Sequence, residues 1–199
     1  MEFEVLVNPP QAIFDQIVHL TSQTEGWSHQ LVDYHYWRTN FDGYWLYTVV
    51  ERSTQKLVAS VSLARWDDPK SGPLFSIGLF YCAPKYRGQG HANRIWNEIM
   101  KIIGAQSAVL FGALKMSEKY EKVHGFDKTP EFWHNASRFE MADLRFPDVS
   151  SVSDKKYSVK WWHEAAEDEL AAFDATICRR NRWRMMKSWF GLDDTFTKV

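Results

Sequence analysis

The stretch Arg87-Gly88-Gln89-Gly90-His91-Ala92 decides the fold of this chain. It follows an apolar run, Leu74 to Cys82, and precedes a segment whose apolar residues recur at the spacing of one helical face. A short glycine-containing turn that opens a helix points several backbone N–H groups at one place, where the helix dipole adds partial positive charge. Gly88 and Gly90 tolerate positive φ angles and close approach, and Arg87 adds a formal charge. The stretch therefore predicts an anion-binding turn that suits a pyrophosphate.

The turn differs from the common nucleotide-binding loops. It lacks the G-x-x-x-x-G-K sequence, followed by Ser or Thr, of a P-loop, and it lacks the third glycine of a G-x-G-x-x-G dinucleotide fingerprint. Nucleoside triphosphates and NAD are therefore poor candidates for its ligand.

The longer segment Phe80 to Ala92 resembles the cofactor motif of the GNAT superfamily of acetyl-CoA-dependent N-acyltransferases. That motif has Gln or Arg, then Gly three residues later, then Gly or Ala two residues after that; Arg87, Gly90 and Ala92 match it. Cys82 to Gly88 matches the V-x-P-x-Y-R-G sequence that usually precedes the helix, with cysteine in place of valine. Farther along, Tyr120 to Phe126 resembles the family's second signature, a tyrosine followed by a helix end and Gly-Phe.

The resemblance implies a mixed α/β (α+β) fold. In this GNAT fold a twisted mixed sheet has splayed central parallel strands and is flanked by helices, and here it would carry a helical C-terminal extension. The implied co-substrate is acetyl-CoA. Its pyrophosphate would bind Arg87, Gly88, Gln89, Gly90, His91 and Ala92, and its pantetheine arm would pair with the open edge of Phe80, Tyr81 and Cys82.

The resemblance also implies chemical roles. Tyr120 is the expected catalytic residue, which gives a proton to the departing thiolate, and the backbone N–H of Cys82 is expected to hold the thioester oxygen. The thiol of Cys82 reads as a small buried apolar group rather than as a nucleophile. Leu74 to Cys82 contains no carboxylate, so the general base stays open; Glu51, Asp67, His35 and His124 are the candidates.

Aromatic residues crowd the region expected to bind the acceptor, and either a pocket for an apolar or cationic amine or ordinary core packing explains them. These residues are Trp27, Tyr34, His35, Tyr36 and Trp37.

Composition limits the other functions. In the 199 residues, 45% are apolar and 16% aromatic, which predicts a packed globular protein. The net charge of -1 selects neither nucleic acid nor an acidic membrane surface, and Ala108 to Leu114 is far shorter than the roughly 20 apolar residues of a membrane span. Two distant cysteines and an N-terminus without a signal pattern favour a cytoplasmic protein, and no ligand spacing predicts a metal site.

Periodicity and turn residues predict the order of elements. Asn8-Pro9-Pro10 is expected to start the first helix, with the Asn8 side chain as its cap. Strands are expected at Phe3–Val7, Tyr44–Glu51, Lys56–Trp66, Leu74–Cys82 and Ala108–Leu114, and closing strands at Phe132–His134 and Arg138–Leu144. Further helices are expected at Gln30–Arg38, Gly90–Ile103 and Ser117–His124.

The polar segment Asp148 to Lys156 reads as a linker, so we expect a GNAT domain at 1–147 and an extension at 148–199. In the extension we expect a strand at Tyr157–Trp162 and one long helix or two in Glu164–Phe190, with acidic residues early and basic residues late, as the helix dipole favours. Its aromatic residues need a partner surface, either the first domain or another subunit of a homo-oligomer. This extension resembles the start of the second half found in a GNAT subgroup common in nematodes.

Together these features predict an acetyl-CoA-dependent N-acetyltransferase that acts by direct attack of a primary amine of a small molecule or peptide. The alternative is a GNAT-fold sensor or interaction module that binds acyl-CoA without turnover.

Overall fold

A computed structural model describes residues 2–128, 140, 142, 145, 159–192 and 197 of the chain. The chain forms two compact units: the first comprises 1–111 and 166–196, and the second comprises 112–165 and 197–199. The predicted boundary near residue 147, the linker and the closing strands at Phe132–His134 and Arg138–Leu144 fall almost entirely outside the described residues, so they stay predictions.

Five strands of the first unit form one sheet in the order β1-β2-β3-β4-β5. Neighbouring strands from β1 to β4 are antiparallel, and β4 and β5 are parallel, as expected for two strands joined through a crossover helix. The strands are β1 (Phe3–Val7), β2 (Gly43–Glu51), β3 (Leu57–Trp66), β4 (Leu74–Cys82) and β5 (Ser107–Leu110). The predicted strand positions are thus confirmed, except that the last one ends at Leu110 rather than at Leu114.

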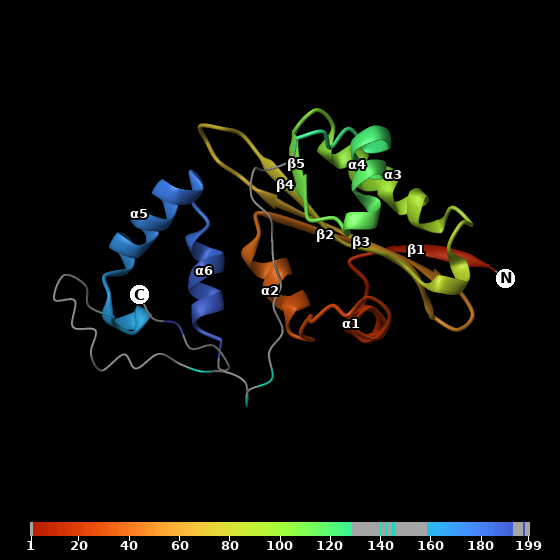
Figure 1. The fold of residues 1–199 in the computed structure, drawn as a ribbon, viewed down its shortest axis with the longest axis horizontal. Helices are drawn as coiled ribbons and strands as arrows, with labels where there is room; N and C mark the ends of the chain where they lie inside the picture. The colour runs from red at the N-terminus through yellow and green to blue at the C-terminus, as the bar shows by residue number, and fades with distance from the viewer. Residues whose placement is uncertain are drawn as a thin grey trace. The chain divides into compact units, whose positions relative to one another are not determined.

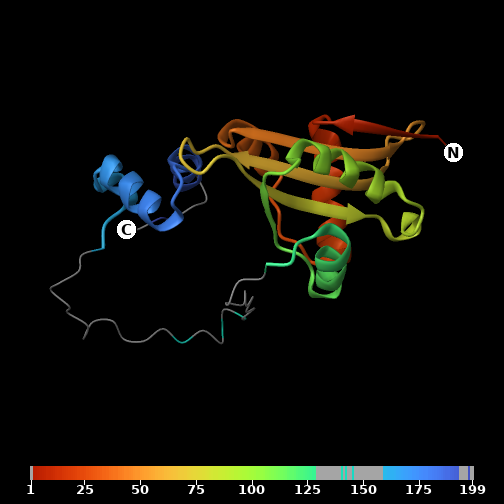
Figure 2. The same ribbon diagram turned by 90° about the horizontal axis from the view of Figure 1, so that it is seen from above.

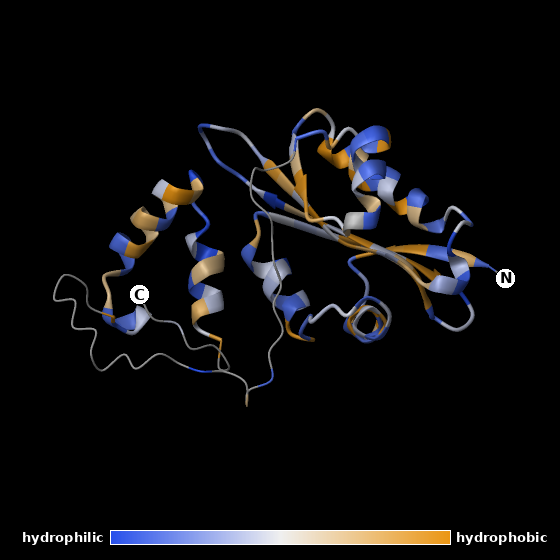
Figure 3. Ribbon diagram, viewed as in Figure 1, coloured by the Kyte–Doolittle hydropathy of each residue, from blue (hydrophilic) through white to orange (hydrophobic). Residues whose placement is uncertain are grey.

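Helices α1 (Gln11–Glu25) and α2 (Asp33–Asn40) lie on one face of this sheet, and α3 (His91–Ile103) lies on the other (Figures 1 and 2). Hydrophobic stretches recur along the strands, and hydrophobic and hydrophilic residues alternate along α3 (Figure 3). The buried side of α3 carries Ile95, Trp96, Ile99 and Ile103. The sheet centre is β3, because residues 57 to 64 are all buried.

The Asn8 prediction was wrong. Helix α1 begins after Pro10 without a side-chain cap, because the Asn8 side chain is used elsewhere. Its Oδ1 accepts a hydrogen bond from the Leu46 N–H at 2.8 Å, and the Asn8 N–H donates to the Leu46 carbonyl at 2.8 Å. Asn8, at a positive φ of 50°, therefore joins the end of β1 to β2 rather than capping the helix.

The C-terminal segment of the first unit contains two helices rather than one, α5 (Glu167–Cys178) and α6 (Trp183–Phe190). Acidic residues occupy the first turn of α5, and Lys187 lies in the last turn of α6, as the helix dipole favours. The last turn of α5 has no basic residue. Arg184 instead reaches α2: its Nε donates to the Asn40 carbonyl at 3.1 Å and its Nη2 pairs with Asp42 at 3.1 Å.

In the second unit, η2 (Leu114–Met116) leads into α4 (Ser117–His124), which ends at Gly125 with a left-handed φ of 74°, as predicted. Farther along the second unit, Trp162 begins the short helix η5 (Trp162–Glu164). The described part of the expected strand at Tyr157–Trp162 is therefore not a strand. None of the helices among the described residues is long and apolar enough to cross a membrane.

Candidate functional site

The turn before α3 has the backbone that the sequence predicts. It follows the 3-10 helix η1 (Pro84–Tyr86), and its glycines have φ angles of +79° at Gly88 and +85° at Gly90. A Cβ at either position would meet no atom within 4 Å, so it is the left-handed backbone, not crowding, that calls for glycine. Open space beside both glycines leaves room for a ligand.

The first turn of α3 is uncapped. Gly90 is its N-cap, no side chain caps the helix, and the first turn has no acidic residue. The first N–H groups of a helix have no partner within the helix, and the dipole makes this end partially positive. The geometry therefore suits an anion held by main-chain groups.

The Arg87 side chain is engaged within the protein rather than directed only at this space. Its Nε donates to the Cys82 carbonyl at 3.0 Å, and its Nη2 forms an ion pair with Glu25 at 2.6 Å. Glu25 is the last residue of α1, so Arg87 connects the end of that helix to the end of β4. Sequence reasoning missed this role of Glu25, because nothing in the local sequence links two residues 62 positions apart.

The side chains of Gln89 and His91 contact residues that precede the turn in the sequence. Gln89 Nε2 donates to the Lys85 carbonyl at 3.0 Å, and the His91 ring lies 4.3 Å from the Phe3 ring, centre to centre. Ala92 follows His91 in the first turn of α3. The side chains of Gln89 and His91 thus contact residues outside the turn, and the binding of an anion by the main chain of Gln89, His91 and Ala92 stays a prediction.

A buried carboxylate lies under the turn. The Tyr86 hydroxyl donates a hydrogen bond to Glu51 Oε1, and the Thr54 hydroxyl donates to Oε2 at 2.7 Å. Lys85 Nζ lies 3.6 Å from the same carboxylate. The hydrogen bonds from Tyr86 and Thr54 lower the pKa of Glu51, so this group is a fixed anion rather than a base.

One edge of β4 opens where its pairing with β5 stops. The last parallel pair is Ile77 with Leu110, and the Ala83 N–H donates to the Val58 carbonyl of the β3 segment at 2.9 Å. Because N–H groups alternate along a strand, the N–H of Cys82 points to the other edge, on the side of β5. Within the described residues, no strand pairs with that edge from Gly78 to Cys82.

A bulge lies at the start of this open edge. Gly78 pairs with Ser62 and Tyr81 pairs with Ser60, so two residues of β4 oppose one of β3. Leu79 has a positive φ of 48°, and its carbonyl accepts a hydrogen bond from the Ser60 hydroxyl at 2.7 Å. Gly78 was the sequence signal for this bulge, since an isolated glycine in a strand often marks one.

The three residues at this edge differ in the direction of their side chains. Phe80 contacts Trp96 of α3, with ring centres 4.8 Å apart, whereas Tyr81 contacts Trp27 on the opposite face, at 6.5 Å. Burial raises the pKa of the Cys82 thiol, and Arg87 opposes this effect. A thiol that keeps its proton is a poor nucleophile, which agrees with the reading of Cys82 as a packing residue.

Tyr120 lies on α4 in the second unit. Its side chain is buried, and burial raises the pKa of its hydroxyl. Its ring centre lies 6.2 Å from that of His124 and 6.5 Å from that of Phe126, so it packs against the residues of its own signature.

The aromatic region between α1 and α2 is part core and part surface. Tyr34 is buried, stacks on Phe14 at 4.9 Å and donates its hydroxyl hydrogen to the Pro9 carbonyl, so it is a core residue. His35 is exposed. Trp27 and Trp37 instead flank a residue that the sequence analysis did not consider, His29, with ring centres 5.9 and 5.6 Å from its ring.

His29 is a half-buried imidazole in this aromatic region. Burial lowers its pKa, which the Asp33 carboxylate, 3.9 Å from Nδ1, partly opposes. Imidazole with a pKa below its usual value is mostly uncharged at neutral pH and can accept a proton. Of the residues first considered as bases, Asp67 pairs with Arg65 at 3.0 Å, Glu51 is held by Tyr86 and Thr54, and His35 is exposed. His124 is the last residue of α4 in the second unit, and burial lowers its pKa as well, so it stays a candidate.

Comparison with known proteins agrees with this geometry. A family model described as "Protein of unknown function (DUF1248)" matches residues 1–177. No curated protein matches the chain. An acetyltransferase from Trypanosoma brucei is similar in structure, with a TM-score of 0.53 and 22% identity over 69% of this chain and 100% of its own.

Two other solved structures resemble the chain to a similar degree. A predicted acetyltransferase from Clostridium acetobutylicum, solved with acetyl-CoA, has a TM-score of 0.53 and 18% identity over 68% of this chain and 96% of its own. Glucosamine-6-phosphate N-acetyltransferase from Arabidopsis thaliana has a TM-score of 0.51 and 14% identity over 70% of this chain and 100% of its own. The chain therefore has the fold of the GNAT acetyltransferases, as the sequence predicts.

Proposed function

We propose that this chain, which belongs to the family described as a protein of unknown function (DUF1248), is an acetyl-CoA-dependent N-acetyltransferase. Its acceptor is the primary amine of a small molecule or peptide, which attacks the thioester directly. The observation that carries the proposal is the open edge of β4 beyond Ile77, which η1 and the glycine-containing turn connect to the uncapped start of α3.

The co-substrate fits these residues. The main-chain groups of Arg87 to Ala92 would hold the pyrophosphate, as helix N-termini hold phosphates elsewhere, and the edge at Phe80, Tyr81 and Cys82 would pair with the pantetheine arm as an added strand. Arg87 would exchange its bond with the Cys82 carbonyl for one with a phosphate.

The chemistry needs a neutral amine, a stabilised oxyanion and a proton for the thiolate. We assign proton removal from the amine to His29, because its ring lies beside Trp27, which itself contacts Tyr81 next to Cys82. Burial also lowers the pKa of the imidazole, which favours its uncharged form at neutral pH. The amine nitrogen then bonds to the acetyl carbon, and the Cys82 N–H stabilises the oxygen that gains charge. As the C–S bond breaks, Tyr120 gives its proton to the sulfur. With reference pKa values of about 10 and 8.5, that transfer is uphill by roughly 2 kcal/mol. Burial raises the pKa of the Tyr120 hydroxyl, so the transfer in the protein is more uphill than this reference value.

Two measurements test the proposal. Titration calorimetry with acetyl-CoA tests binding, and release of free thiol over a panel of amines tests turnover. Binding with thiol release supports the enzyme. Binding without release over the whole panel favours the alternative, an acyl-CoA-binding sensor without turnover, and failure to bind acetyl-CoA rules out both.

A further inference from the structure

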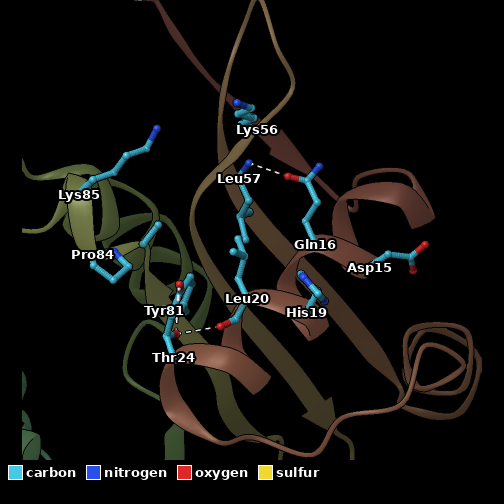
Figure 4. A pocket seen from close by; sticks show the side chains of 11 residues that line it. Asp15, Gln16, His19, Leu20, Thr24, Lys56, Leu57, Tyr81, Pro84 and Lys85 are labelled. Atoms are coloured by element: carbon cyan, nitrogen blue, oxygen red, sulfur yellow. Dashed lines mark hydrogen bonds between the residues drawn. The ribbon is translucent and has the colours of Figure 1, made fainter.

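A second concave site lies on the face of the sheet that α1 covers, and we call it the α1–β4 pocket. It has a volume of about 700 Å³ and is formed by residues of α1, the start of β3 and the end of β4 with η1 (Figure 4). This volume is typical of small-molecule sites. None of the residues Arg87 to Ala92 lines it, so it is distinct from the anion-binding turn.

The walls of the α1–β4 pocket are apolar. They are made by Leu20, Leu57, Tyr81, Ala83 and Pro84. Tyr81 contributes its side chain on the α1 face, whereas the pantetheine arm is proposed to contact the main chain at the strand edge.

The polar side chains of the wall already have partners within the protein. Gln16 accepts a hydrogen bond from the Leu57 N–H at 2.9 Å and donates to the Gln55 carbonyl at 3.0 Å, and the Thr24 hydroxyl donates to the Leu20 carbonyl at 2.8 Å (Figure 4 shows those to Leu57 and Leu20). A polar ligand would find few unused partners there, because each of these groups would lose a bond to gain one. The wall therefore selects a ligand with an apolar body.

The rim of the pocket is positively charged. Lys56 and Lys85 both lie above the apolar residues in Figure 4. Within the described residues, the Lys56 ammonium has no acidic partner. Lys85 forms an ion pair with Glu51, whose carboxylate also accepts hydrogen bonds from Tyr86 and Thr54. The lining carboxylate, Asp15, accepts a hydrogen bond from Gln11 at 2.8 Å and points away from the apolar wall. Among the described lining residues, Lys56 is therefore a cation without an acidic partner, and Lys85 is a second cation whose partner, Glu51, is not part of the lining.

We propose that the α1–β4 pocket binds a small molecule that has an apolar body and a carboxylate group. The body packs on the wall between Leu20 and Pro84, and the carboxylate lies at the rim near Lys56 and Lys85. This proposal goes beyond the acetyl transfer proposed above and does not depend on it.

A matched pair of probes tests the proposal on the full chain. Titration calorimetry measures binding of 4-phenylbutyrate and of its neutral amide, 4-phenylbutyramide, which has the same apolar body. We expect saturable binding of the carboxylate and at least fivefold weaker binding of the amide. No saturable binding of the carboxylate, or equal affinity for both compounds, would overturn the proposal.

Three variants locate the binding. Lys56→Glu should weaken the binding of 4-phenylbutyrate about tenfold. Lys101 is an exposed lysine of α3, on the other face of the sheet, and Lys101→Glu should leave the affinity for 4-phenylbutyrate within twofold. Leu20→Trp should narrow the pocket and weaken binding in a protein that still melts cooperatively. Unchanged affinity in both Lys56→Glu and Leu20→Trp would place the ligand elsewhere and refute the site.

Titration of each variant with acetyl-CoA separates this proposal from the proposed function. We expect all three to bind acetyl-CoA as the original chain does. Loss of carboxylate binding with intact acetyl-CoA binding supports a separate site, whereas parallel loss of both ligands would contradict it.

Discussion

Tyr120 keeps its proton at neutral pH, because burial raises the pKa of its hydroxyl above the ordinary value. A protonated phenol is the form that a leaving thiolate requires. We therefore expect Tyr120→Phe to lower the rate of thiol release at least tenfold, with the dissociation constant of acetyl-CoA unchanged. Steady-state kinetics and calorimetry measure the two quantities. An unchanged rate would remove Tyr120 from the chemistry and leave it a packing residue beside His124 and Phe126.

His29 has the opposite task, since it must be uncharged to accept a proton. Burial lowers the pKa of the imidazole below its usual value of 6.5, so the ring loses its proton at a lower pH. The rate should therefore rise with pH through this lowered pKa and level off towards neutral pH. We expect His29→Gln to lower the rate by about 10²-fold or more and to remove this acidic limb of the pH–rate profile. Exposed His35, on α2, provides the control: His35→Gln should keep both the rate and the limb. A limb that persists in His29→Gln would assign the base elsewhere.

Glu51 connects stability to pH. Its pKa is lower in the folded state than in the unfolded chain, so the ionised carboxylate stabilises the fold above the unfolded pKa of about 4.5, and this stabilisation is lost as pH falls through the folded pKa. Glu51→Gln should melt at a lower temperature than the original chain at pH 7, and the difference should shrink below about pH 4.5. Thermal melts followed by circular dichroism measure this. Glu118→Gln, in which an exposed helical carboxylate pairs with Lys122, should show little difference at either pH.

At the scale of elements, the turn and α3 act together. Gly90 starts the helix at φ +85°, a conformation that costs a residue with a Cβ about 1–2 kcal/mol. We expect Gly90→Val to weaken acetyl-CoA at least tenfold, because it distorts the backbone and puts a side chain into the ligand's space. Gly72→Val is the matched control, at φ +72° and with open space around it in the loop before β4. Gly72→Val should lose a similar amount of stability but keep its affinity for acetyl-CoA. If Gly90→Val folds, as circular dichroism would show, and binds acetyl-CoA as tightly as the original chain, the placement of the pyrophosphate is refuted.

The elements that the sequence predicted are those whose signals are local. The alternating pattern of β3 and the glycines of the turn report the backbone at their own positions, and the structure agrees with both. Asn8 was misread, because a helix cap and a bond to a neighbouring strand need the same side chain, and only the fold decides between them. The ion pair of Arg87 with Glu25 and the surroundings of His29 were out of reach for the same reason, since both depend on how α1 lies on the sheet.

At the scale of the molecule, the C-terminal segment of the first unit makes polar contacts with α2, with Asp42 just after it and with the loop before β4. Besides Arg184, the Ser188 hydroxyl donates to Asn40 Oδ1 at 2.8 Å, and Arg180 donates to the Gly72 carbonyl at 2.7 Å. Within one chain, these contacts join part of the predicted extension, residues 166–196, to the first unit. Docking of the whole extension and association between subunits stay predictions.

These contacts are exposed in part, so each should contribute little. We expect the double variant Arg184→Ala with Ser188→Ala to lose about 1 kcal/mol, or about 2–4 °C in melting temperature, and to exchange the amide hydrogens of α6 faster. Lys187→Ala is the control on the same helix, because Lys187 pairs with Glu167 of α5 rather than with α2. If both variants loosened α6 equally, contacts within the helical pair rather than with α2 would hold it.

The hydrogen bond from Arg87 to the Cys82 carbonyl also affects how the open edge of β4 is exposed to other chains. An unpaired strand edge is a template on which other chains can add, and natural proteins protect such edges with charged side chains. Arg87 covers the end of this edge with a guanidinium that is itself anchored by Glu25. We therefore expect Arg87 to hinder the addition of a further strand at the end of this edge, and so to oppose aggregation.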